Sequence, residues 1–320
     1  MAVRFVEATS EDEGQRVDNF LMRQFRNVPR TLIYRVIRKG EVRVNKGRVK
    51  QSTRLKEGDI VRLPPIRVPE KAETIVPHGQ MKRIEDNILY EDNDLMVVNK
   101  PSGIAVHGGS GINFGLIEIL REMRPLAKRM ELVHRLDRDT SGCILIAKKA
   151  KVLKELHAQI REDKMIKEYI TLLAGSWDKN KQKIDLPLAK NTLQSGERMV
   201  KVDPNGKQSI SFFNLVHHYP SADLVTVRLK TGRTHQIRVH ALSQGCPVIG
   251  DDKYGDRTAN KALKKMGMKR LALHAQFLSF RHPNIEHEQN SWMKMEAPLH
   301  DDFKKTINYL KKELEQDIER

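Results

Sequence analysis

Apolar residues recur at two different periods along the chain, and the change of period separates a small N-terminal region from a larger one. In residues 17–25 and 33–37 they lie three or four positions apart, which predicts two short helices, the second ended by Gly40. In residues 41–49 apolar and polar positions alternate around an Asn-Lys-Gly turn, as in a β-hairpin. A further turn and strand are expected in residues 56–63. The N-terminal pattern therefore predicts two helices packed on a small hairpin.

Prolines and polar residues then replace the apolar pattern, and strands follow. Residues 68–86 are predicted to form a linker between a small domain at 14–67 and a large domain at 87–320. The patterns predict strands at 88–90, 95–98, 131–134, 142–148, 169–173, 209–216, 224–229 and 271–280, and helices at 151–160, 234–242 and near the C-terminus. Strands follow one another without a regular helix between each pair. This order predicts an α+β domain with a mixed, mainly antiparallel sheet rather than a doubly wound parallel one.

Positive charge is concentrated in the small N-terminal domain. The chain has 58 Lys and Arg against 41 Asp and Glu, a formal net charge of +17. Residues 14–67 hold fifteen basic and four acidic residues, a net charge of +11. A solvated helix face would normally intersperse acids, but only Asp18 lies between Glu13 and Glu41. A basic surface of this kind favours nucleic acid, since phosphate contacts release counterions. The residues expected to bind RNA are Arg30, Arg35, Arg38, Lys39, Arg43, Lys46 and Arg48.

The cysteines and the lengths of the apolar runs indicate the cellular compartment in which the protein is expected. Cys143 and Cys246 lie among apolar or small neighbours and show no CxxC spacing, so both are expected to be buried thiols. The N-terminal residues lack the layout of a signal peptide, and no apolar run approaches the length of a membrane span. We therefore expect a cytoplasmic protein with no membrane partner.

The candidate chemistry is concentrated in a charged loop between two expected strands, at residues 134–141. The loop contains a histidine, two arginines, two aspartates, a threonine and a serine. The segment that begins at Asp139 is ordinary turn chemistry, but a turn does not require Asp137. From the residues alone, a functional and a structural role for Asp137 remain equally open.

Three other kinds of site can be weighed for this loop. A serine nucleophile would need Ser141 in a G-x-S-x-G elbow, which is absent. The string of His134, Arg135 and Asp137 superficially resembles a kinase catalytic loop, but the spacing is wrong and a glycine-rich nucleotide loop is missing. The histidines of the chain do not show metal-ligand spacing, so no metal is expected.

Several passages along the chain are similar, in the same order, to the signatures of the RluA family of pseudouridine synthases. They are residues 98–103, 134–142, 167–169, 231–240 and 271–275. The N-terminal domain, with its basic helix at 30–39 and its RKGEVRVN passage, resembles the S4 RNA-binding domain. The resemblance implies an α+β fold of the pseudouridine-synthase type, a mixed, mainly antiparallel sheet flanked by helices, preceded by a small S4 (αL-type) RNA-binding domain.

The resemblance also implies roles for individual residues. Asp137 is implied as the attacking carboxylate. Burial beneath a base disfavours its charged form, so a fixed cation is required, and the resemblance implies Arg238. Tyr169 is implied to stack on the target base and to help remove its C5 proton. A uridine inside folded RNA has to be flipped out of its stack to reach this carboxylate. The implied substrate-binding residues are Arg135, Leu273 and His134.

The activity implied by the resemblance is the isomerisation of specific uridines in large-subunit (23S) ribosomal RNA, free or in pre-ribosomal particles. The residues leave open whether the carboxylate attacks the sugar, adds to C6 of the ring or takes a proton in a glycal route. The reaction involves no net redox change or hydrolysis, so no cofactor is expected, and a monomer is the default. Two other hypotheses remain: a non-catalytic S4-type RNA-binding or ribosome-assembly protein, and a glycosidic hydrolase that pairs Asp137 with Asp139 or Glu168.

Overall fold

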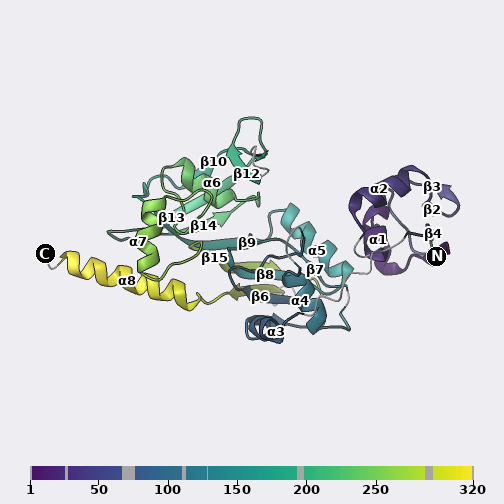
Figure 1. The fold of residues 1–320 in the computed structure, drawn as a ribbon, viewed down its shortest axis with the longest axis horizontal. Coiled ribbons are helices and arrows are strands. Elements are labelled where there is room, and N and C mark those ends of the chain that lie inside the picture. The colour runs from purple at the N-terminus through teal and green to yellow at the C-terminus, as the bar shows by residue number, and fades with distance from the viewer. Residues whose placement is uncertain are drawn as a thin grey trace. The chain divides into compact units, whose positions relative to one another are not determined.

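The chain forms two compact units, residues 1–75 and 76–320, and each is described by itself (Figure 1). The computed structural model describes residues 2–25, 28–66, 76–109, 113–127, 129–192, 198–284 and 291–318. Residues 68–75 of the predicted linker lie outside this part of the chain. The rest of that range is largely helical: α3 (His78–Glu85) begins after Pro77 and buries Ile84 in the core of the larger unit. Met81 packs against the same core, and the mostly polar composition of the rest of the helix obscured these two apolar positions.

The N-terminal unit contains the two predicted helices and the predicted hairpin. Its elements are β1 (Arg4–Glu7), the 3₁₀ helix η1 (Ser10–Asp12), α1 (Val17–Gln24), α2 (Arg30–Arg38), β2 (Arg43–Val44), β3 (Gly47–Arg48) and β4 (Ile60–Leu63). The strands pair antiparallel in the order β1-β4-β2-β3. Asn45 and Lys46, with φ of 48° and 67°, form the hairpin turn, and Gly40, with φ of 74°, follows α2. The predicted turn and helix end are therefore confirmed.

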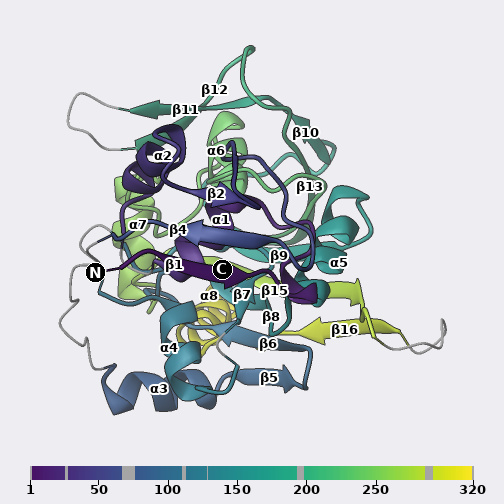
Figure 2. The same ribbon diagram turned by 90° about the vertical axis from the view of Figure 1, so that its right-hand side faces the viewer.

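One large sheet organises the second unit, and Figure 2 shows its strands from β5 at the lower edge upwards. In spatial order the strands are β10 (Lys183–Asp185), β13 (Ile210–His218), β14 (Asp223–Leu229), β9 (Ile166–Leu173), β15 (Leu273–Arg281), β8 (Ser141–Ala147), β6 (Leu95–Lys100) and β5 (Ile88–Glu91). β16 (Trp292–Glu296) pairs with β15, and β7 (Glu131–Leu132) pairs with β8. The β15–β8 pair is parallel and its neighbours are antiparallel. The predicted mixed, mainly antiparallel α+β fold is confirmed.

Helices and a separate hairpin surround this sheet. The helices are α4 (Leu116–Met123), α5 (Ala150–Arg161), α6 (Gln236–Ser243), α7 (Arg257–Lys265) and α8 (Asp301–Ile318). The hairpin is formed by β11 (Leu188–Thr192) and β12 (Arg198–Val202). The sequence patterns did not predict α4, α7, β10, β11, β12 or β16. None of the helices in the described ranges combines the length and apolar character that a membrane crossing requires.

Side-chain alternation along the strands divides the core of the larger unit between the two faces of the sheet. On β6, Met96 and Val98 join α4 in one apolar cluster, whereas Leu95 and Val97 join α5 in another. On β9, Tyr169 belongs to the cluster that also contains residues of α4 and α6. Alternation therefore places Tyr169 on the same face of the sheet as α6, which carries part of the candidate site.

Candidate active site

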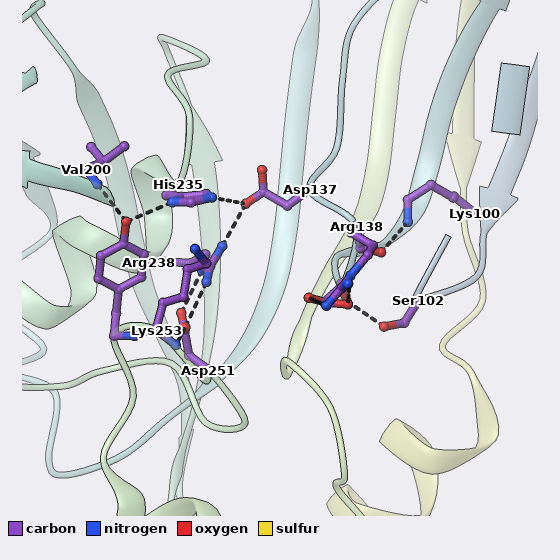
Figure 3. Close-up of polar contacts among 11 residues, drawn as sticks. Lys100, Ser102, Asp137, Arg138, Val200, His235, Arg238, Asp251 and Lys253 are labelled. Carbon is purple, nitrogen blue, oxygen red and sulfur yellow. Dashed lines mark hydrogen bonds and ion pairs between the residues drawn. The ribbon is translucent and has the colours of Figure 1, made fainter. Parts of the chain in front are cut away.

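The loop between β7 and β8 carries Asp137 and is held by its neighbours. Lys100, at the end of β6, is fully buried, and its Nζ donates hydrogen bonds to the carbonyl oxygens of Pro101, Ile104 and Arg138 at 3.0, 2.9 and 3.0 Å. Figure 3 shows the bond to Arg138. Burial lowers the pKa of Lys100 to about 7, although Asp139 and Asp137 act to raise it. This one amine therefore ties the end of β6 to the loop immediately after Asp137.

The start of β8 fixes the other side of the loop. Gly142 has φ of 109°, and a Cβ atom there would lie 2.2 Å from the carbonyl oxygen of Ala275 on β15. Only glycine fits this close approach of two backbones. The same strand pair buries Ser141, whose hydroxyl contacts Nδ1 of His274 at 2.8 Å. The exit of the loop is thus fixed by tight packing against β15.

Arg238 on α6 bridges Asp137 to a second carboxylate. Its Nη1 donates to Asp137 Oδ2 at 3.1 Å, and its Nε and Nη2 donate to Asp251 at 2.6 and 2.8 Å. Figure 3 shows the guanidinium between the two carboxylates. The Asp251 side chain is fully buried, whereas 23% of the Asp137 side chain is exposed. One aspartate therefore anchors the cation, and the other remains accessible.

The charges of this group stabilise one another. Burial acts to lower the pKa of Arg238, but Asp251 and Asp137 hold it above its ordinary value. Burial also acts to raise the pKa of Asp251, yet Arg238 and the backbone N–H groups of Lys253 and Tyr254 hold it below the usual range. The cation and its anchor therefore stay charged, and a fixed positive charge lies beside Asp137.

A small pocket opens over Asp137. Residues from the loop, β9, β14, α6 and β15 line it: Arg135, Leu136, Asp137, Thr140, Tyr169, Leu229, Arg233, His235, Gln236, Ile237, Arg238 and Leu273. Burial raises the pKa of the Tyr169 hydroxyl, and Asp137 raises it further. The structure thus brings together five of the residues that the sequence singled out, Arg135, Asp137, Tyr169, Arg238 and Leu273, from four separate parts of the chain.

His134 is the exception among the predicted site residues. Its Nε2 accepts a hydrogen bond from the backbone N–H of Leu145 at 3.2 Å, and it is absent from the pocket lining given above. Burial lowers its pKa to about 3, with a further contribution from Lys167. The neutral ring accepts its hydrogen bond from a backbone N–H of β8 and so supports the loop that carries Asp137. We therefore do not include His134 in the proposed substrate contacts.

The basic residues of the N-terminal unit lie on its surface. All seven predicted RNA-binding side chains are exposed. Asp18, the acid that interrupts this basic stretch, is buried and pairs with Arg16 at 2.7 Å. Arg30 also lies 3.5 Å from this carboxylate. Asp18 therefore pairs with arginines at the edge of this surface, and the other six predicted RNA-binding side chains are exposed around α2 and the hairpin.

Four residues of the site were missed by sequence reasoning: Asp251, Tyr254, His235 and the Lys100 anchor. Asp251 and Tyr254 lie between Gly250 and Gly255, where any Cβ atom would lie within 2.3 Å of a neighbouring carbonyl oxygen. Two glycines that frame an acid and an aromatic residue are a recognisable signal for a tight functional turn. No sequence signal links Lys100 to carbonyl oxygens 38 residues away.

Comparison with known proteins gives matches in both units of the chain. Residues 94–243 match the family model for RNA pseudouridylate synthase, and residues 15–61 match the S4 domain. This chain is similar to the solved structure of human RNA pseudouridylate synthase domain containing 4. The match has a TM-score of 0.59 and 24% sequence identity, and it covers 73% of this chain and 96% of the human chain. The match with the solved structure of human RNA pseudouridylate synthase domain containing 1 has a TM-score of 0.52 and 22% sequence identity, and it covers 74% of this chain and 98% of the human chain. These two structures support the fold alone.

The chain belongs to the RNA pseudouridylate synthase family and is an isomerase that converts uridine in RNA to pseudouridine. Among its relatives, ribosomal large subunit pseudouridine synthase C of Escherichia coli K12 is 49% identical over 314 residues, 97% of each chain. The protein of the same name from Haemophilus ducreyi is 49% identical over 307 residues, 95% of this chain and 94% of that one. The similarity therefore spans both units.

Proposed function

We propose that this enzyme isomerises specific uridines of large-subunit ribosomal RNA and that Asp137 is its attacking carboxylate. The observation that carries the proposal is the 3.1 Å contact between Asp137 and the anchored guanidinium of Arg238 in an open pocket. The names of the relatives support the RNA class. In this proposal the enzyme acts as a monomer on RNA that is free or in pre-ribosomal particles.

Each pocket residue has a physical task in this proposal. Arg238 keeps Asp137 ionised while a uracil ring covers it and excludes water. In this proposal Tyr169 offers the flat face of its ring and Leu273 an apolar side chain to the base, and the Tyr169 hydroxyl assists removal of the C5 proton. Arg135 is exposed at the pocket rim and carries a planar guanidinium. It can stack in the space that the flipped uridine leaves.

Asp137→Asn tests the attacking role. The amide has nearly the same shape but cannot act as an anionic nucleophile or base, so we expect loss of at least about a thousandfold in turnover with RNA binding retained. The measurement is tritium release from ribosomal RNA labelled at C5 of uridine, beside a filter-binding assay. Asn substitution of the exposed Asp252 is the matched control and should leave turnover unchanged.

The same experiment separates the alternatives. An S4-type binding or assembly protein would bind RNA without tritium release and would be indifferent to Asp137→Asn. A glycosidic hydrolase would release free uracil, which chromatography detects. Wild-type rates from the Asp137→Asn enzyme would remove this residue from the mechanism.

A further inference from the structure

His235 lies beside the candidate nucleophile, and the proposed function gives it no task. Its Nε2 is 3.8 Å from Asp137 Oδ2, and its Nδ1 is 2.8 Å from the hydroxyl of Tyr254. The residue adopts a left-handed backbone with φ of 55° immediately before α6. For a residue other than glycine this conformation costs about 1–2 kcal/mol. Contacts on both ring nitrogens hold the side chain in this strained position.

The hydroxyl of Tyr254 can select which ring nitrogen of His235 carries the proton. This hydroxyl accepts a hydrogen bond from the backbone N–H of Val200 in β12 at 2.8 Å. Its own proton is then free to be donated to Nδ1 of His235, which leaves the ring proton on Nε2. Leu188, Val200, Val239 and Tyr254 form a small buried apolar cluster that packs the β11–β12 hairpin against α6. The hairpin therefore holds the hydroxyl in place.

Electrostatics favour the same tautomer. An Nε2–H group directed at Asp137 is attracted by the carboxylate, whereas an Nε2 lone pair would be repelled. Burial lowers the pKa of His235, and Arg238 and Lys253 lower it further, against the opposing effects of Asp137 and Asp251. The ring is thus a neutral donor. Its contact with Asp137 is longer than a hydrogen bond, as is common for catalytic contacts before substrate binds.

Both polar contacts on the Asp137 side chain fall on the same oxygen. Arg238 Nη1 lies 3.1 Å from Oδ2, and His235 Nε2 lies 3.8 Å from it. In Figure 3 the other carboxylate oxygen of Asp137 points away from both partners. Contacts with Oδ2 alone leave Oδ1 without either of these partners.

We propose that His235 is a positioning residue for Asp137: its Nε2–H is offered to Oδ2, so that Oδ1 is presented to the substrate. In the same proposal Tyr254 fixes the tautomer of His235 through a hydroxyl that the β11–β12 hairpin holds. This inference rests on the proposed function, because it takes Asp137 as the attacking group. The inference also gives the β11–β12 hairpin a part in the catalytic geometry, because the backbone N–H of Val200 is the first hydrogen-bond donor in the series that leads through Tyr254 and His235 to Asp137.

A pair of substitutions at His235 tests the contact with Asp137. The amide nitrogen of asparagine occupies the position of Nδ1, whereas that of glutamine occupies the position of Nε2. We expect His235→Asn to lower the single-turnover rate on the order of tenfold, and His235→Gln to recover most of the wild-type rate. The apparent Kd for the RNA should not change in either variant. His78→Asn, an exposed histidine of α3, is the control.

Tyr254→Phe tests whether the tyrosine acts through His235. Phenylalanine keeps the ring that lies 5.0 Å from the Arg238 guanidinium and removes only the hydroxyl. We expect a severalfold lower rate with unchanged RNA affinity, and no further loss when Tyr254→Phe is added to His235→Asn. Multiplied losses in the double variant would show that the two residues act independently.

The outcomes distinguish this inference from the proposed function. Circular dichroism melting of each variant establishes that it is folded before rates are compared. Equal rates for His235→Asn and wild type, or equal losses for the asparagine and glutamine variants, would overturn the positioning role while wild-type turnover still supports the function. A wild-type enzyme that releases no tritium from ribosomal RNA would refute the proposed function and this inference together.

Discussion

At the scale of single residues, one guanidinium serves two carboxylates with unlike surroundings. The planar fork of Arg238 uses Nε and Nη2 for the buried Asp251 and leaves Nη1 for Asp137. A lysine could not divide its donors in this fixed way, because its ammonium is a single point charge on a flexible chain. The direction of the cation is therefore set by a residue that does not line the pocket.

Asp251→Asn should separate orientation of the cation from charge in the pocket. The amide keeps the shape but loses the charge-assisted bonds to Arg238, so we expect about 1–3 kcal/mol of lost stability. We also expect at least about a tenfold fall in kcat as Nη1 shifts relative to Asp137. Thermal denaturation and tritium release measure the two effects.

The exposed neighbour Asp252→Asn is the control and should resemble the wild type in both assays. An Asp251→Asn enzyme with normal kcat would show that Arg238 keeps its position without this anchor.

At the scale of elements, the site depends on how strand ends and one helix start meet. β6 ends in the Lys100 anchor, β8 begins at the close approach of Gly142 to β15, and α6 begins with the strained His235. None of these features is repeated along its element. Each is a local exception that makes a loop or a side chain rigid where Asp137 has to be held.

Gly142→Ala tests the close approach of β8 and β15. The added Cβ would meet a backbone oxygen at 2.2 Å in addition to the strain of a positive φ, so we expect more than about 3 kcal/mol of lost stability and little activity. Gly245→Ala is matched to it, because Gly245 has φ of 75° and nothing within 4 Å of the added atom.

That control should cost only about 1 kcal/mol, the strain of the backbone alone. Urea denaturation of both variants measures the difference. Similar losses from the two substitutions would show that backbone strain, and not the contact with Ala275, makes glycine necessary at position 142.

At the scale of the whole molecule, the basic charge and the chemistry are carried by different units. The candidate site lies in residues 76–320, whereas a net charge of +11 lies in residues 14–67. Phosphate contacts give affinity that falls with salt, but they do not perform isomerisation. We therefore propose that the N-terminal unit places the enzyme on its RNA and that the larger unit selects and converts the uridine.

Combined Ala substitution of Arg35, Arg38 and Lys39 tests this division of tasks. These side chains are exposed on and just after α2, so their removal should leave the fold intact and weaken RNA binding. We expect the slope of log affinity against log salt to become shallower by about 2–3, as for the loss of two or three phosphate contacts.

The turnover of bound RNA should stay near the wild-type value, which single-turnover tritium release measures. Removal of two exposed lysines of α8, Lys311 and Lys312, is the control with nearly the same change in charge. An equal change of slope in that control would assign the affinity to net charge rather than to the surface of the N-terminal unit.

The sequence by itself determined much of this protein. The periods of apolar residues predicted the two N-terminal helices, the hairpin turn and most strands of the sheet, because burial of one face imposes these periods locally. The similarity of ordered passages to a known family indicated Asp137 and Arg238, which the structure places 3.1 Å apart. Helix α3 was missed, since two apolar residues, Met81 and Ile84, are too few to establish a period.

Only the tertiary structure decided how the site is supported. Asp251, Tyr254 and Lys100 act through contacts with backbone groups and side chains far away in the sequence, and no spacing rule encodes such contacts. In the structure His134 accepts a hydrogen bond from Leu145 of β8, whereas His235 lies 3.8 Å from Asp137. Sequence patterns record which side chains are buried together, whereas the direction of each donor depends on how the whole sheet and its helices pack.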